Sequence, residues 1–114
     1  MNKLKIICII PARGGSKGLK NKNILKINNQ FLISRTIEYA KSCKEIDIIL
    51  VTTDSKKIAN VAEKAGAIVP FLRPKELATD LATTEDTLKH ALVEYERISK
   101  IKFDFCIFLS PTDI

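Results

Sequence analysis

The sequence lacks long apolar runs, cysteine motifs and, over residues 1–37, any acidic side chain. Its longest apolar segments, "IICII", "IDIILV" and "FCIFL", are far shorter than the roughly 20 residues that span a bilayer. The apolar residues after Lys3 and Lys5 are too few for a signal peptide, and no small-residue cleavage site follows them. We therefore expect a soluble, cytoplasmic protein that does not bind a membrane.

The three cysteines form an odd set with no C-x-x-C spacing. Cys8 and Cys106 lie within apolar segments, where a free cysteine behaves as a small hydrophobic residue, and Cys43 lies apart from both. This pattern excludes a disulfide framework and a zinc site, and we predict no metal-ligand set within the chain.

The formal net charge of +6 is concentrated in the acid-free segment 1–37. Such asymmetry favours an anionic partner, either a nucleic acid backbone or a small phosphorylated ligand. Phe31 is the only aromatic residue near the basic side chains, so the segment offers no stacking platform for bases. We expect a small phosphorylated ligand and no nucleic acid. The basic residues of the segment are Lys3, Lys5, Arg13, Lys17, Lys20, Lys22, Lys26 and Arg35.

Apolar segments alternate with amphipathic ones along the 114 residues, which we treat as one domain, 1–114. Continuous apolar runs predict buried strands over 4–10, 46–51 and 103–109, and "AIVPF" predicts a short edge strand because it contains Pro70. This order indicates an α/β fold: a Rossmann-like, mostly parallel sheet with flanking helices.

Helical spacing of apolar residues predicts three helices. The first covers 31–43, and the second starts after Asp54 or Ser55 and stops at Gly66. The third starts at Thr83 or Thr84, and His90 is expected on its surface. The chain stops just after the last predicted strand, whose outer edge would need another element, so we expect a truncated domain.

The octapeptide "PARGGSKG", residues 11–18, follows the first predicted strand, and ligands of open α/β sheets bind beyond the carboxyl ends of strands. Its glycines allow backbone amides to approach an anion, while Arg13 and Lys17 add a guanidinium and an ammonium group. The spacing matches neither a Walker loop nor a dinucleotide fingerprint. We predict a long phosphate-binding loop for a triphosphate.

The stretch "IIPARGGSKGLKNKNI" resembles the signature of cytidylyltransferases that activate nonulosonic acids, namely the CMP-sialic acid synthetases and their relatives for legionaminic and pseudaminic acids. The likeness continues through "VTTDS", "RPKELATDLATTED" and, more loosely, "FLSPTDI". It spans essentially the whole chain and corresponds to the first half of such an enzyme. The resemblance implies the fold type of the nucleotide-diphospho-sugar transferases.

The resemblance also implies a reaction, in which the anomeric hydroxyl of a nonulosonic acid attacks the α-phosphorus of CTP to give a CMP-sugar and pyrophosphate. It gives catalytic roles to Arg13 and Lys17, the latter stabilising the leaving group. It implies Mg²⁺ held by aspartates beyond residue 114, and a homodimer whose interface segment also lies beyond that residue.

Substrate-binding positions follow from the same resemblance. Arg73 and Thr84 match the cytosine and ribose side of the pocket, although Arg73 can also be read as a surface charge and Thr84 as a helix cap. The family usually has glutamine at the position of Ser110, and the shorter serine reaches less far toward a sugar. The full substrate-binding set is Ala12, Gly14, Gly15, Ser16, Asn23, Arg73, Ala82, Thr84 and Ser110.

Two alternatives stay open at this point. One is a different nucleotidyltransferase that acts on a sugar phosphate or an alditol phosphate. The other is a non-catalytic nucleotide-binding module, because the chain lacks the carboxylates that the family uses for metal. Nucleotide preference separates the first alternative from a CTP enzyme, and turnover separates the second.

Overall fold

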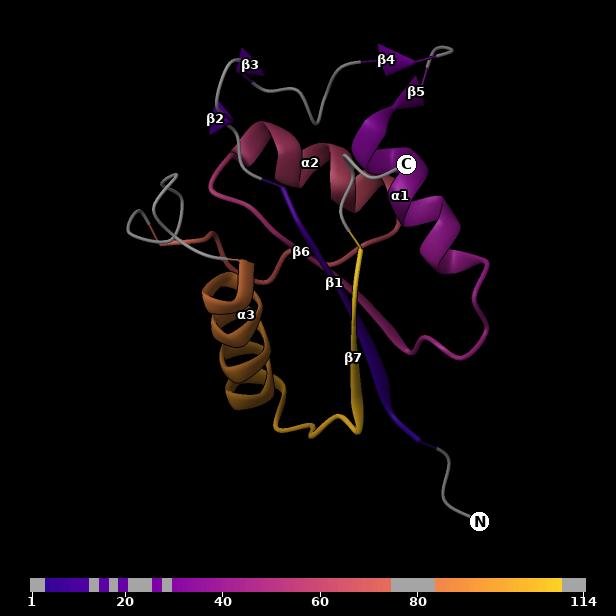
Figure 1. Ribbon diagram of the computed structural model, residues 1–114, viewed down its shortest axis with the longest axis vertical. Coiled ribbons are helices and arrows are strands. Elements are labelled where there is room, and N and C mark those ends of the chain that lie inside the picture. Colours follow the sequence, from indigo (N-terminus) through magenta and orange to yellow (C-terminus); the bar gives the residue numbers. More distant parts are fainter. Residues whose placement is uncertain are drawn as a thin grey trace.

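The computed structural model describes residues 4–12, 15–16, 19–20, 26–27, 30–74 and 84–109. Their centre is a parallel sheet of β1 (Ile6–Pro11), β6 (Ile48–Thr52) and β7 (Phe105–Phe108), in the order β6-β1-β7 (Figure 1). The predicted parallel α/β sheet is confirmed.

Helices cover both faces of this sheet (Figure 1). On one face, α1 (Leu32–Lys41) and α2 (Lys56–Ala65) pack on Cys8, Ile10 and Val51. On the other face, α3 (Thr84–Ser99) places Ala91 against Ile7 and Ile9. Neighbouring residues of a strand point to opposite faces, so a continuous apolar run is what β1 needs between two layers of helices. None of the helices in the described part of the chain is long and apolar enough to cross a membrane.

The ends of α2 follow the predicted signals. Of the two candidate caps, Ser55 is the one used, since its Oγ accepts a hydrogen bond of 3.3 Å from the Ile58 amide. Gly66 ends the helix in the left-handed region, at φ 112°, where a side chain is unfavourable.

The predicted strand "AIVPF" is reduced to a single parallel bridge between Leu50 and Ile68. The Ile68 amide donates to the Ile49 carbonyl at 2.9 Å, and the Ile68 carbonyl accepts from Val51 at 3.0 Å. Pro70 has no amide hydrogen to continue this ladder, which explains why the strand ends here.

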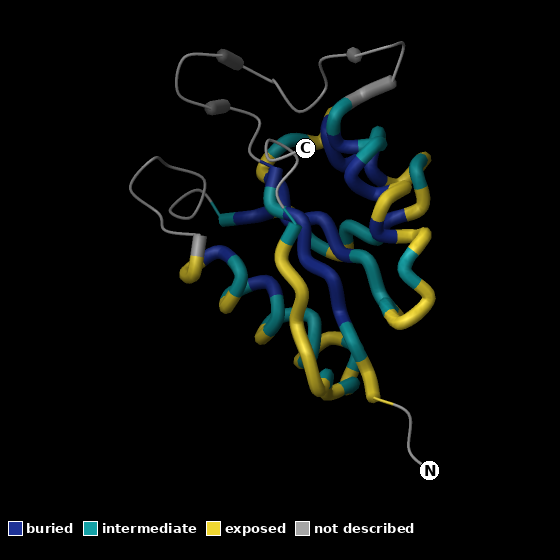
Figure 2. Tube along the Cα trace, turned by 45° about the vertical axis from the view of Figure 1, so that its right-hand side comes forward, coloured by how far each residue is buried: buried dark blue, intermediate teal, exposed yellow. Residues whose placement is uncertain are grey.

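The prediction that the last strand is buried is wrong. β7 pairs with β1, yet all four of its residues are exposed, including Phe105 at 56% and Phe108 at 40% (Figure 2). The reason is its position: the residues of β1 and β6 belong to the two helix-covered cores, whereas those of β7 belong to neither. Of the two outer strands of the described sheet, β6 also has the Ile68 bridge on its outer side.

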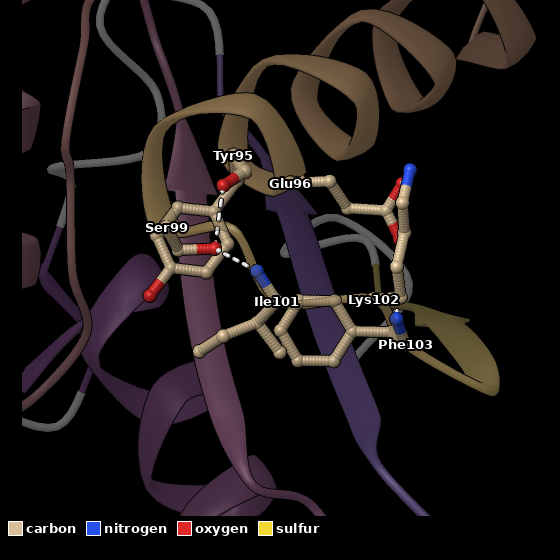
Figure 3. Close-up of polar contacts among 6 residues, drawn as sticks. All are labelled: Tyr95, Glu96, Ser99, Ile101, Lys102 and Phe103. Carbon is tan, nitrogen blue, oxygen red and sulfur yellow. Dashed lines mark hydrogen bonds and ion pairs between the residues drawn. The ribbon is translucent and has the colours of Figure 1, made fainter.

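The connection from α3 to β7 is held by side chains at the helix end (Figure 3). The Ser99 hydroxyl donates to the Tyr95 carbonyl at 2.7 Å and accepts from the Ile101 amide at 3.2 Å. The Glu96 carboxylate accepts from the Phe103 amide at 3.1 Å, and the rings of Phe103 and Tyr95 stack with centroids 6.0 Å apart. These contacts set the direction in which the chain enters β7.

Candidate functional site

The carboxyl edge of the sheet is the place where the structure brings predicted site residues together. β1 and β6 end side by side, with Pro11 in register with Thr52. Beyond that pair, the amide of Ala12 donates to the Thr52 carbonyl at 3.0 Å, and Ala12 is only 2% exposed. The start of the predicted phosphate loop is therefore fixed at the edge where open α/β sheets bind ligands.

Arg73 reaches the same edge from the segment that follows the Ile68 bridge. Its Nη2 donates to the Thr52 carbonyl at 2.7 Å, and its amide donates to the Thr53 carbonyl at 2.7 Å. The residue is 5% exposed, so the alternative reading of Arg73 as a surface charge is wrong. Arg73 and Ala12, far apart in sequence, thus share one acceptor oxygen.

The remaining predicted residues are only partly described. Gly15 and Ser16 form β2 (Gly15–Ser16), which pairs antiparallel with β3 (Leu19–Lys20). Farther along, β4 (Lys26–Ile27) pairs with β5 (Gln30–Phe31), so the segment predicted as a plain loop contains two short ladders. Thr84 is the first residue of α3. Six predicted residues lie outside the described ranges: Arg13, Gly14, Lys17, Asn23, Ala82 and Ser110.

Two threonines at this edge were not predicted as site residues. Thr52 and Thr53 are fully buried, and the Thr53 Oγ1 accepts a hydrogen bond of 3.1 Å from the Ser55 amide. The Thr52 Oγ1 is buried and has no hydrogen-bond partner within the part of the chain that the structure describes. The available signal was a pair of hydroxyl residues directly after a buried strand, in "VTTDS".

The described residues do not form a metal site. No group of three or more His, Cys, Asp or Glu side chains within the described ranges could hold a metal ion. The implied Mg²⁺ therefore has no ligand set among these residues, and no chemical step is assigned to it below.

His90 lies at the surface only in part, because it is half-buried. Its ring is edge-on to Phe71 at a centroid distance of 5.5 Å, and its Nδ1 is buried with no hydrogen-bond partner among the described residues. The sequence pattern of α3 alone misses this contact because Phe71 belongs to a different segment.

Comparison with known proteins now identifies the family. The family model described as cytidylyltransferase matches residues 7–114. The chain belongs to the cytidylyltransferase family. The family match includes β1, the octapeptide after it and the carboxyl edge formed by Ala12, Thr52 and Arg73.

Two relatives of this chain have names that state a reaction. The chain is 50% identical over 91 residues to an N-acylneuraminate cytidylyltransferase of Escherichia coli, covering 80% of this chain and 22% of that protein. It is 44% identical over 108 residues to a CMP-N,N'-diacetyllegionaminic acid synthase of Campylobacter jejuni, covering 95% of this chain and 46% of that protein. The chain thus spans less than half the length of each relative.

A solved structure shares the fold. A CMP:2-keto-3-deoxy-manno-octonic acid synthetase complexed with CTP superposes with a TM-score of 0.69 at 23% identity, over 94% of this chain and 40% of that one. At this identity the likeness shows the fold alone. The three-stranded sheet and its helices therefore share the fold of the corresponding part of that synthetase.

Proposed function

We propose that the protein transfers CMP from CTP to the anomeric hydroxyl of a nonulosonic acid and releases pyrophosphate. The observation that carries the proposal is the anchoring of Ala12 at the carboxyl edge, directly before the Arg13–Gly18 loop, in a chain of the cytidylyltransferase family. The names of the two relatives support a nonulosonic acid as the acceptor.

In the proposed reaction, the loop has to stabilise negative charge on the departing pyrophosphate. The anomeric hydroxyl loses its proton to solvent while its oxygen forms a bond to the α-phosphorus. The bond from that phosphorus to the bridging oxygen breaks, and pyrophosphate leaves with additional negative charge. Cationic groups and amides that face this charge lower the barrier. In the proposal, Arg13 holds the triphosphate and Lys17 stabilises the departing pyrophosphate, with the amides of Gly14, Gly15 and Ser16 completing the anion site.

Recognition of the nucleoside is assigned to the opposite side of the pocket. The proposal places Arg73 and Thr84 on the cytosine and ribose side, with backbone groups of Ala12 and Ala82 along the base edge. It gives Asn23 a contact to the nucleotide and Ser110 a place near the sugar acid. Mg²⁺, the homodimer and the cytoplasmic location remain predictions from the sequence and the resemblance.

Nucleotide titration of the wild-type chain and Lys17→Ala tests the proposal. We expect CTP to bind more tightly than ATP or GTP. Lys17→Ala should weaken CTP at least about tenfold, since it removes a charge-assisted contact to phosphate, and should change the affinity for CMP much less. Lys44→Ala is the control, because Lys44 follows α1 outside the loop and its loss should change neither affinity. Equal losses for CTP and CMP would contradict the role of Lys17, and a preference for ATP or GTP would favour the other nucleotidyltransferases.

A turnover assay separates the enzyme from a non-catalytic module. Pyrophosphate release is measured with CTP, Mg²⁺ and either N-acetylneuraminic acid or N,N'-diacetyllegionaminic acid. Release that depends on one of the sugar acids supports the proposed reaction. Binding of CTP without turnover would favour the nucleotide-binding module for this chain.

A further inference from the structure

The side chain of Thr52 is buried at the carboxyl edge of the sheet. Thr52 is the last residue of β6 and has no exposed surface. It lies two residues after Leu50, which packs with Ala91 of α3, so its side chain points to the α3 face of the sheet. Thr84, which the proposal places on the nucleoside side of the pocket, is the first residue of that helix. The Thr52 hydroxyl is therefore buried on the face of the sheet where the nucleoside is proposed to bind.

Thr52 also contacts two residues that the proposal assigns to the nucleotide. Its carbonyl oxygen accepts hydrogen bonds from the Ala12 amide at 3.0 Å and from Arg73 Nη2 at 2.7 Å. Its Oγ1, in contrast, has no hydrogen-bond partner in the described ranges. The adjacent Thr53 shows the usual arrangement, since its Oγ1 accepts from the Ser55 amide at 3.1 Å. A buried hydroxyl without a partner has lost its hydrogen bonds to water, so the free chain is less stable for keeping it.

We infer that Thr52 is a positioning residue for the proposed reaction, and that its hydroxyl gains a hydrogen-bond partner when the cytidine part of the substrate binds. The inference rests on the proposed function for the identity of the ligand. Because solvent does not reach the hydroxyl in the free chain, the partner has to arrive through a shift of the segments that cover it. Ala12 and Arg73 are both bonded to Thr52, so a nucleoside that contacts them acts directly on its surroundings.

Removal of the hydroxyl should weaken the nucleoside contacts and leave the phosphate contacts unchanged. We expect Thr52→Val, a nearly isosteric change, to weaken CTP and CMP by the same factor of about five, which corresponds to one neutral hydrogen bond. The affinity for inorganic tripolyphosphate, which has no nucleoside, should not change. This pattern differs from the one expected for Lys17→Ala, which should weaken CTP much more than CMP.

Stability separates this role from a merely structural one. Thr52→Val should raise the urea midpoint of the free chain while it weakens nucleotide binding, since the hydroxyl has no partner among the described residues. Thr52→Ser keeps the hydroxyl but removes a buried methyl group, so it should lower the midpoint and retain the wild-type affinity. A residue that only supports the fold would change stability and affinity in the same direction.

Isothermal titration calorimetry with CTP, CMP and tripolyphosphate, combined with urea unfolding, tests the inference on the 114-residue chain. Thr36→Val is the matched control, because Thr36 is buried in α1 and its hydroxyl donates to the Leu32 carbonyl at 3.2 Å. Its affinities should equal those of the wild type.

Three results would overturn the inference and leave the proposed function standing. One is an equal CTP affinity in Thr52→Val and the wild type, and another is a loss of tripolyphosphate affinity as large as the loss for CTP. The third is a lower urea midpoint in Thr52→Val, which would show that the hydroxyl already has a partner in the free chain. A wild-type chain that binds neither CTP nor CMP would overturn both the inference and the proposed function.

Discussion

Cys8 lies inside β1 without exposed surface, and this burial, with smaller contributions from the thiols of Cys106 and Cys43, raises its pKa from 9.0 to about 12. The folded chain therefore keeps the thiol proton at a pH where the unfolded chain releases it. The contribution of Cys8 to stability is complete below about pH 9 and is lost as the pH rises toward 12.

A comparison of the wild-type chain with Cys8→Ala tests this effect. We expect urea unfolding of the wild type to lose more stability between about pH 8 and about pH 10.5 than unfolding of Cys8→Ala, which has no thiol at this position. The quantity to compare is the difference in this loss between the two chains, because they differ only in the side chain at position 8. Parallel losses would contradict the shift at Cys8.

The Thr52 hydroxyl is buried and has no hydrogen-bond partner among the described residues, so a substitution that removes it should stabilise the chain. Thr52→Val replaces a buried Oγ1 that has no hydrogen-bond partner with a methyl group of similar size, and it should stabilise the chain by about 1 kcal/mol in urea unfolding. Thr53→Val is the control, since the Thr53 Oγ1 accepts from the Ser55 amide, and it should destabilise by about 1 kcal/mol. A loss of stability in Thr52→Val would show that its hydroxyl is satisfied in solution.

At the level of elements, the residues that follow two of the helices have the left-handed backbone conformation. One of them is a glycine and the other is a lysine. Gly66 has φ 112°, and a Cβ there would lie 3.0 Å from the Lys41 Nζ. Lys100 has φ 60° just after α3, although its side chain disfavours this conformation.

Substitutions at these two positions should change the free energy of unfolding in opposite directions. Lys100→Gly should raise the free energy of unfolding by about 1 kcal/mol, and Gly66→Ala should lower it by about 1 kcal/mol or more. Thermal or urea unfolding of both variants measures this. A destabilised Lys100→Gly would contradict the assigned backbone strain.

The sequence predicts the elements better than it predicts their surroundings. The apolar run of β1, the spacing in α1 and the cap at Ser55 are local signals, and all three are confirmed. The exposure of β7 is not local, since "FCIFL" reads the same in an interior strand and in an edge strand.

The candidate site shows the same limit. The sequence predicts a phosphate-binding loop after the first strand, because glycines and basic residues there form a local pattern, and the structure places Ala12, which precedes the loop's basic residues, at the carboxyl edge of the sheet. The sequence did not predict that the Thr52 carbonyl oxygen accepts hydrogen bonds from both Ala12 and Arg73. A backbone carbonyl is present in every residue, so residue types do not indicate which one distant segments will contact. The roles of Arg13, Lys17 and Asn23 stay predictions.

For the molecule as a whole, β7 presents an apolar edge. Its described residues carry no charge, and within the described part of the chain only β1 pairs with it. Exposed strands of this kind favour association between copies, and natural edge strands are often protected by lysine.

Ile107→Lys should therefore reduce self-association of the 114-residue chain. Ile107 is 37% exposed, so the substitution should leave the thermal midpoint nearly unchanged while lowering the concentration dependence of sedimentation. Val93→Lys is the control, because Val93 is 53% exposed and belongs to a helix, α3, and not to a strand. An equal decrease in both variants would assign the association to general hydrophobicity.

The most direct test of nucleotide binding at the carboxyl edge is to follow backbone amide signals by NMR during titration with CTP. We expect the amide signals of Ala12, Thr52 and Arg73 to shift when CTP binds, while those of Glu38 and Lys64, on α1 and α2, keep their positions. Shifts confined to α1 and α2, with none at Ala12 or Arg73, would contradict the proposed site.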